Sequence, residues 1–323
     1  LVKDITTKPD IQTWDNEAYD NLHSDLNRMF KFLIPAITKN YEKILVIPHD
    51  ILSYLPFESL INEIDNPCPY IICDYEISYS YSAQLWYQSK SLDNIKGGNL
   101  FLYSPHENPS DPNYLQFAKE ESDFIKEHEK TISFDYLDKK SFKDTLNAFN
   151  QHHFLSHANF NLSESDSSHL SIGRGQKIYL EDIIEQDLKS NLVVLSACNT
   201  GIGKLEKAEG VISLGRGFRS AGAKAIIMST HTVSDKASSD IMKGFYANLN
   251  KGVEKNGALS LAKRQYFGNK PIYQQHPYFW SGFIIYGDEI ALHSRSNTKI
   301  FLLTILIVAC LLLAIRLLYL IRD

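Results

Sequence analysis

Two short segments place reactive side-chain types directly after strand-like apolar runs. The segment NLVVLSAC ends at Cys198, and the segment HHFLSH ends at His157. A cysteine thiolate is the strongest common side-chain nucleophile, and a nearby imidazole can favour the thiolate or protonate a departing amine. The spacing between the two positions suits one crossover between neighbouring parallel strands. The two segments therefore predict a cysteine and histidine pair that carries out acyl transfer.

Three histidines of one segment compete for the role of the base. Side chains alternate along a strand, so His153 and His157 are predicted to lie on one face and His152 on the other. Taken alone, each of them is more often a structural histidine than a base. Only the pairing with Cys198 distinguishes His157.

A phosphate-binding loop is a second interpretation of the cysteine segment. If Gly203 and Lys204 formed its end, Cys198 would occupy the position of the first glycine. Leu205 would then occupy the position of the hydroxyl residue. Both replacements remove a physical function, the sharp turn and the magnesium ligand, so nucleotide binding is not predicted.

Other short motifs also lack residues that their chemistry needs. The segment GRGFRS, which begins at Gly215, has Ser220 at the third glycine position of a dinucleotide fingerprint and lies within a helical pattern. Close helix packing is the better explanation for it. No Gly-x-Ser-x-Gly elbow occurs, so a serine hydrolase has little support. No cofactor and no metal site are predicted.

The elements that must position the pair follow from the alternation of strand-forming runs with amphipathic segments. Strands are expected at residues 43–48, 70–80, 99–105, 152–157, 191–198, 223–230 and 283–288. Helices are expected at residues 117–129, 141–150 and 208–223, the last with Val211, Leu214, Phe218 and Ala221 on one face. This alternation predicts an α/β fold with a mainly parallel sheet flanked by helices. Ligands then bind at the carboxyl ends of strands.

Composition narrows the class of protein. The 323 residues, 44% of them hydrophobic, are enough for a substantial core. The net charge of −5 comes from 33 basic and 38 acidic side chains mixed along the sequence, so no nucleic acid partner is expected.

The four cysteines show no disulfide-framework spacing. They are Cys68, Cys73, Cys198 and Cys310. Cys68 and Cys73 have no second Cys/His pair that would complete a zinc site, so they are expected to be ordinary buried thiols in a reducing compartment.

The last part of the chain reads as a membrane span. Residues 300–321 are apolar on all sides apart from a few positions, and they are long enough for about 30 Å of helix, the thickness of a bilayer core. A buried core helix would normally show a polar face. The flanking charges do not decide the orientation of the span. The chain begins at Leu1 without an initiator methionine or an export leader, so we expect it to be a fragment of a longer protein.

Five ordered segments carry a resemblance to a known family. They are residues 47–60 (IPHDILSYLPFESL), 153–160 (HFLSHANF), 192–230, 233–235 and 276–288 (HPYFWSGFIIYGD). Together they resemble the CHAT domain, a caspase-like cysteine protease module related to separase, caspases and gingipains. The resemblance covers nearly the whole chain up to about residue 290.

The resemblance implies roles for individual residues. The catalytic dyad carries over to His157 and Cys198, with Cys198 attacking a peptide carbonyl and His157 protonating the departing amine. The backbone N–H groups of Ala158 and Cys198 would form the oxyanion hole. Ala158 stands where many relatives have glycine, which restricts its conformation. Glu209 and Asp235 match acidic positions that would favour a basic residue before the cleaved bond, although Glu209 is equally well placed to stabilise the start of a helix.

The resemblance also implies a domain organisation. Residues 1–130 would form a degenerate caspase-like half and residues 131–292 the active half. A linker at 293–299 and the membrane span at 300–321 would follow. Relatives carry helical repeats upstream that sense a partner, which predicts a regulatory protein partner.

These observations predict a cysteine endopeptidase that acts on proteins or peptides and is activated by a partner. A single membrane span would anchor it, with the catalytic domain in the cytoplasm. Two alternatives stay open. A catalytically silent scaffold would use the same fold to bind partners at a membrane, and an acyltransferase or deamidase would share the first chemical step.

Overall fold

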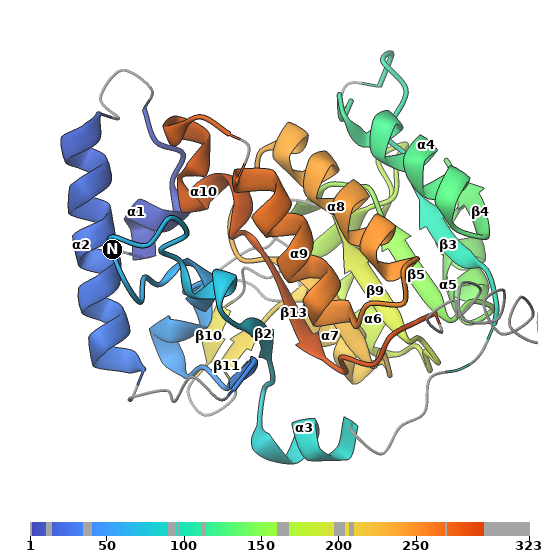
Figure 1. Cartoon of the computed structure of the whole chain (residues 1–323). Helices are drawn as coiled ribbons and strands as arrows, with labels where there is room; N and C mark the ends of the chain where they lie inside the picture. The colour runs from blue at the N-terminus through green and yellow to red at the C-terminus, as the bar shows by residue number, and fades with distance from the viewer. Residues whose placement is uncertain are drawn as a thin grey trace, which may run out of the picture.

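An eight-stranded sheet forms the centre of the computed structural model (Figure 1). The structure describes residues 2–10, 15–34, 41–89, 95, 97–111, 114–159, 168–196, 204–206, 210–268 and 270–293. The strand order in the sheet is β1-β2-β13-β12-β9-β5-β3-β4. The bounds are β1 (Lys43–Val46), β2 (Glu76–Tyr79), β3 (Leu100–Tyr103), β4 (Thr131–Phe134), β5 (Gln151–Phe154), β9 (Leu192–Leu195), β12 (Ala225–Ser229) and β13 (Phe283–Gly287).

The sheet consists of two parallel blocks that run in opposite directions. Strands β12, β9, β5, β3 and β4 are parallel to one another, and so are β13, β2 and β1. The blocks meet where β12 pairs antiparallel with β13. The predicted mainly parallel sheet is therefore confirmed. The carboxyl ends of β12, β9, β5 and β3 all reach the same edge, where a ligand site is expected.

Seven strands of the central sheet lie within the runs that the sequence predicts, or overlap them. Strands β3, β9, β12 and β13 are buried along their whole length. Their apolar runs are continuous because helices cover both faces of the sheet. Strand β4 was not predicted because this edge strand is only partly buried and has no continuous apolar run.

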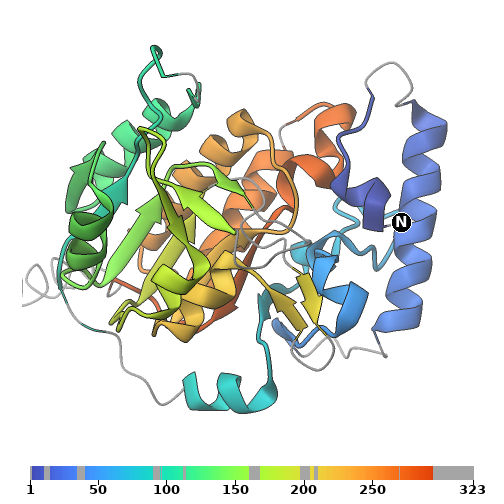
Figure 2. The same cartoon turned by 180° about the vertical axis from the view of Figure 1, so that it is seen from behind.

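Helices cover both faces of the sheet (Figures 1 and 2). One face carries α4 (Ala118–His128), α8 (Asp235–Leu249) and α9 (Lys255–Phe267). The other carries α5 (Lys139–Leu146), α6 (Leu180–Ile184) and α7 (Leu214–Ser220). The predicted helices at 117–129 and 141–150 correspond to α4 and α5.

The remaining elements surround this three-layer arrangement. Helices α1 (Val2–Thr6), α2 (Asn16–Leu33) and α10 (Pro277–Trp280) lie together beyond the β1 end of the sheet, and α3 (Ala83–Ser89) follows β2 (Figure 1). The 3-10 helices are η1 (Asp50–Tyr54), η2 (Phe57–Ser59), η3 (Ile71–Cys73) and η5 (Ile272–Gln275). A three-stranded sheet contains β6 (Ala158–Asn159), β7 (His169–Ser171) and β8 (Lys177–Tyr179), and a hairpin contains β10 (Lys204–Glu206) and β11 (Gly210–Ile212).

The glycines of the GRGFRS segment serve close packing of α7, as the sequence predicts. A Cβ atom at Gly215 would lie 2.2 Å from the sulfur of Met228, and one at Gly217 would lie 2.5 Å from a methyl group of Leu180. The prediction that a helix spans 208–223 was wrong at its start. Val211 pairs with Leu205 in the β10–β11 hairpin, so α7 begins only after Ser213, whose side chain caps it.

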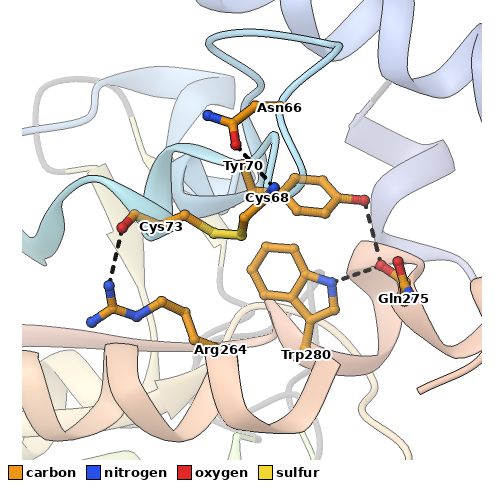
Figure 3. Close-up of a disulfide and its surroundings, with 7 residues drawn as sticks. All are labelled: Asn66, Cys68, Tyr70, Cys73, Arg264, Gln275 and Trp280. Atoms are coloured by element: carbon orange, nitrogen blue, oxygen red, sulfur yellow. Dashed lines mark hydrogen bonds between the residues drawn. A yellow bond between two sulfur atoms is a disulfide. The ribbon is translucent and has the colours of Figure 1, made fainter. Parts of the chain in front are cut away.

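Cys68 and Cys73 form a disulfide, so the prediction of two ordinary thiols was wrong (Figure 3). The chain between them turns back on itself and brings their Cα atoms to 6.1 Å, within the range that a disulfide can bridge. The loop is held by Asn66, which accepts a hydrogen bond from the Cys68 N–H (3.1 Å), and by Arg264, which donates to the Cys73 carbonyl (3.1 Å). With these two cysteines paired, they no longer indicate a reducing compartment.

The membrane span and the domain boundary at residue 130 are the two predictions about the organisation of the chain. Within the described ranges, no helix combines the length and the apolar character needed to cross a membrane. The predicted span at 300–321 and the linker from 294 onward lie outside the described residues. The boundary at residue 130 stays a prediction, and strands from both sides of it share one sheet.

Buried neutral histidines make stability depend on pH. Burial lowers the pKa of His23, His152, His231 and His276 to about 4, from an ordinary value of 6.5. Between these values the unfolded chain binds more protons than the folded chain, so the free energy of unfolding should fall as the pH drops from 6.5 toward 4. The fully buried His152 should contribute as much as about 3 kcal/mol to this loss. Thermal unfolding at a series of pH values checks this, and His152→Gln should give a shallower slope. A melting temperature that stays constant down to pH 5 would contradict the prediction.

Candidate active site

Strands β5 and β9 are parallel neighbours whose carboxyl ends reach the same edge of the sheet. Phe154 and Leu195 are register partners at the ends of these parallel neighbours, and His157 and Cys198 follow this pair by the same number of residues. Beyond the strands, the Ser196 N–H still donates to the Phe154 carbonyl (3.0 Å). Cys198 itself lies outside the described residues.

His157 is half-buried and is held by its backbone as the chain leaves β5. Its carbonyl oxygen accepts a hydrogen bond from the Ser171 N–H (2.8 Å), and the next two residues form β6, which pairs with β7. The Ser156 hydroxyl donates to the Ser171 carbonyl and adds a second tie across the same pair of segments. The backbone that carries the His157 ring is therefore anchored to β7.

A second histidine lies against the first. Strand β3 is the other neighbour of β5, and His106 follows the end of β3 as His157 follows the end of β5. The two rings have centroids 5.2 Å apart. The Nδ1 atom of His106 lies 3.1 Å from Oδ2 of Asp111, and its Nε2 atom lies 3.2 Å from Oγ of Ser171. Burial lowers the pKa of His106, and Asp111 only partly opposes this effect, so the ring is neutral at pH 7.

Asp235 brings a negative charge to the same region. It is the first residue of α8, and its carboxylate interacts electrostatically with His157. Although the residue as a whole is exposed, burial of the carboxyl group raises its pKa. Hydrogen bonds from the backbone N–H groups of Phe117 and Gln116 and the charge of His157 act in the opposite direction.

A buried polar cluster lies on the α4 and α8 side of β5. Nε2 of His153 is 2.9 Å from Oε1 of Glu121, and Nδ1 is 2.8 Å from the hydroxyl of Tyr246. His152 instead contacts Ser190 and the Leu146 carbonyl near α5 (both 2.9 Å). The predicted alternation of His152 and His153 is therefore confirmed, and both are structural residues of the core.

The structure describes some of the predicted site residues and leaves others open. Ala158 lies in β6 and Asp235 begins α8, so both flank His157. Cys198 and Glu209 lie outside the described residues. His106 was not among the predicted site residues, although a histidine directly after the predicted strand at 99–105 was a usable signal. Across the described part of the chain, no cluster of three or more His, Cys, Asp or Glu side chains is arranged to hold a metal ion.

The family model of the CHAT domain matches residues 23–288, which is most of the chain. The chain therefore belongs to the CHAT domain family. Its central sheet and flanking helices share the fold of solved structures of separase and RgpB.

Two curated relatives match part of the chain. Tetratricopeptide repeat protein 28 of Homo sapiens is 33% identical over 116 residues, and the mouse protein of the same name (Mus musculus) is 30% identical over 116 residues. The match covers 36% of this chain and only 5% of each relative. The chain thus spans a small fraction of the length of these repeat proteins.

Solved structures share the fold at low sequence identity. Separase from Saccharomyces cerevisiae, in complex with securin, matches with a TM-score of 0.52 and 13% identity over 83% of this chain and 17% of that chain. The complex of the pro- and mature domains of RgpB from Porphyromonas gingivalis matches with a TM-score of 0.52 and 13% identity over 85% of this chain and 70% of that chain. At this identity the likeness concerns the fold.

Proposed function

We propose that this CHAT domain protein is a cysteine endopeptidase in which Cys198 is the nucleophile and His157 is the general acid and base. One observation carries the proposal. His157 and Cys198 follow register partners on adjacent parallel strands by the same number of residues, at the sheet edge where ligands bind. Membership of the CHAT family and the cysteine peptidase fold support the same reaction class.

The reaction would proceed through an acyl-enzyme. The thiolate of Cys198 attacks the carbonyl carbon of a peptide bond and forms a tetrahedral oxyanion. The intermediate collapses, the C–N bond breaks and the His157 imidazolium protonates the departing amine. A water molecule, deprotonated by His157, then attacks the thioester and releases the acid product and the Cys198 thiolate.

The pairing of β6 supports Ala158 as an oxyanion donor. The Ser171 N–H bonds to the His157 carbonyl, which makes Ala158 and Leu170 a non-hydrogen-bonded pair of the antiparallel ladder. The Ala158 N–H therefore points away from β7. Among the described residues, Asp50 and Arg174 are the non-glycine residues with positive φ, so Ala158 adopts a conformation that needs no glycine. We assign the second donor to the Cys198 N–H.

Asp235 supports a preference for a basic residue before the cleaved bond. Its carboxylate lies within electrostatic range of His157, so a cationic substrate side chain bound beside the dyad would meet a negative charge. Glu209 is a second candidate for the same pocket.

Anchoring and regulation form the outer part of the proposal. The apolar segment 300–321 would hold the domain at a bilayer. A regulatory protein partner would activate the site. The curated relatives are tetratricopeptide repeat proteins, and separase is seen in complex with securin, which supports regulation through a protein partner.

The pH dependence of iodoacetamide alkylation tests the dyad without a known substrate. In the full chain, we expect Cys198 to be alkylated fast at a pH well below about 8.5, the ordinary value for a thiol. The His157→Ala variant should lose this fast reaction because the imidazolium no longer favours the thiolate. Mass spectrometry of the Cys198 peptide measures the rate, and His49→Ala, which removes an exposed histidine elsewhere, serves as control.

Slow alkylation that is indifferent to His157 would contradict the dyad in the isolated chain. A silent scaffold would give this result. Fast alkylation without peptide hydrolysis would instead favour an acyltransferase or a deamidase, because these enzymes share the nucleophile but not the hydrolytic outcome.

A further inference from the structure

A buried histidine outside the dyad occupies the equivalent place on the third strand of the site. Strands β3, β5 and β9 are parallel neighbours with Tyr103, Phe154 and Leu195 in register. His106 follows Tyr103 as His157 follows Phe154. His106 is 1% exposed, and its ring lies beside that of His157 at a centroid distance of 5.2 Å and an interplanar angle of 48°.

The two contacts of the His106 ring determine its tautomer. A carboxylate can only accept, so Nδ1 carries the hydrogen and donates to Oδ2 of Asp111 (3.1 Å). Nε2 is then the acceptor of a hydrogen bond from the hydroxyl of Ser171 (3.2 Å). With both nitrogens engaged, the ring cannot rotate without breaking a hydrogen bond in the interior.

Ser171 connects this ring to the dyad histidine. Its hydroxyl contacts His106, while its N–H donates to the His157 carbonyl (2.8 Å). Resting on the proposed function, we propose that His106 is a positioning residue, held by Asp111 and Ser171, that fixes the ring of His157 for proton transfer at the end of β9.

Two physical effects give this arrangement its value. A fixed neighbouring ring restricts the rotation of the His157 imidazole, and misplacement of a reacting group by about 1 Å can cost about 10²-fold in rate. A neutral neighbouring ring also allows His157 to become positively charged without repulsion, whereas two charged rings at this distance would repel each other. His106 thus contributes through His157 and has no role in bond making.

The test compares two serines that bond to buried histidines. Ser171→Ala removes the hydroxyl at His106 but keeps the N–H that holds His157. Ser190→Ala removes a hydroxyl that lies 2.9 Å from Nδ1 of His152, on the opposite side of β5 from His153. In the full chain, we expect Ser171→Ala to slow alkylation of Cys198 at pH 7 about tenfold and to shift the NMR resonance of the His157 Cε1–H group. Ser190→Ala should change neither. Alkylation and a His157 resonance as in the parent chain in Ser171→Ala would overturn the proposal.

Variants of His106 separate hydrogen bonding from packing. His106→Gln keeps a polar group near the position of Nε2, whereas His106→Phe keeps the ring but no nitrogen. We expect both variants to slow the alkylation of Cys198, because glutamine lacks the ring that lies beside His157 and phenylalanine lacks the nitrogens that Asp111 and Ser171 hold. A phenylalanine variant that reacts as fast as the parent chain would overturn the proposal that these hydrogen bonds fix the ring. Asp111→Ala, at a partly exposed residue, should slow the reaction in the same direction and covers the case in which a core variant does not fold.

Failure of this proposal differs from failure of the proposed function. If alkylation in the parent chain is indifferent to His157→Ala, the dyad is refuted. The His157 resonance in Ser171→Ala against Ser190→Ala still decides whether His106 and Ser171 orient the ring.

Discussion

Replacing Cys198 by alanine is expected to abolish peptide hydrolysis by this chain. The methyl group cannot attack a carbonyl carbon, so no acyl-enzyme forms. His157→Ala should lower kcat/KM by about 10²- to 10⁴-fold, because it removes the acid for the leaving amine and the base for the attacking water. Fluorogenic peptides that vary the residue before the cleaved bond provide the measurement, and arginine and lysine peptides should be cleaved best.

The exposed His49 provides the matched control, since His49→Ala removes a histidine that has no place in the site. Hydrolysis that survives in Cys198→Ala would rule out this nucleophile. Partner binding that is retained in Cys198→Ala, together with a parent chain that cleaves no peptide, would instead favour the scaffold.

Lys263→Met is expected to cause one of the largest losses of stability in the chain. The Lys263 ammonium is 1% exposed and lies 2.9 Å from Oε1 of Glu58, which is itself buried and also accepts a hydrogen bond from the Tyr79 hydroxyl. This pair joins η2, β2 and α9. Removing the lysine leaves an unpaired carboxylate in the core, which costs about 3–5 kcal/mol. The melting temperature should fall by roughly 10 °C.

The double variant Lys263→Met with Glu58→Gln should recover part of this loss, because glutamine carries no charge and can still accept from Tyr79. Lys119→Met is the surface control, since Lys119 pairs with Asp123 where both side chains are largely exposed. A loss in Lys263→Met as small as that in Lys119→Met would show that the buried pair does not hold these elements together.

The sequence was informative wherever a local pattern matched a local cause. Continuous apolar runs such as 192–195 became buried strands because only apolar side chains can fill a sheet that is covered on both faces. The glycines at 215 and 217 indicated close packing of a helix, and a Cβ atom at either position would indeed clash with a neighbouring side chain. Strand β4 was missed because it is an edge strand with exposed positions, so its composition does not reveal it.

Errors arose where the pairing of one residue with another, rather than a periodic pattern, decides the local structure. Val211 fits a helical face by spacing, but its pairing with Leu205 places it in a hairpin. The disulfide between Cys68 and Cys73 depends on a turn that brings their Cα atoms together, and the spacing of the two cysteines does not predict that turn. The pattern of residue types along one segment does not specify the residue with which Val211 or Cys68 pairs.

By itself, the sequence determined the α/β class, the mainly parallel sheet, the strand that ends before His157 and the strand that leads to Cys198. These features are local, because periodicity and composition act over a few neighbouring residues. Only the tertiary structure decided that β3, β5 and β9 lie side by side in register and that His106, held by Asp111 and Ser171, lies beside His157. Residues far apart in the sequence come into contact only through the order of strands in the sheet, and burial then favours a hydrogen-bond partner for each polar group among them.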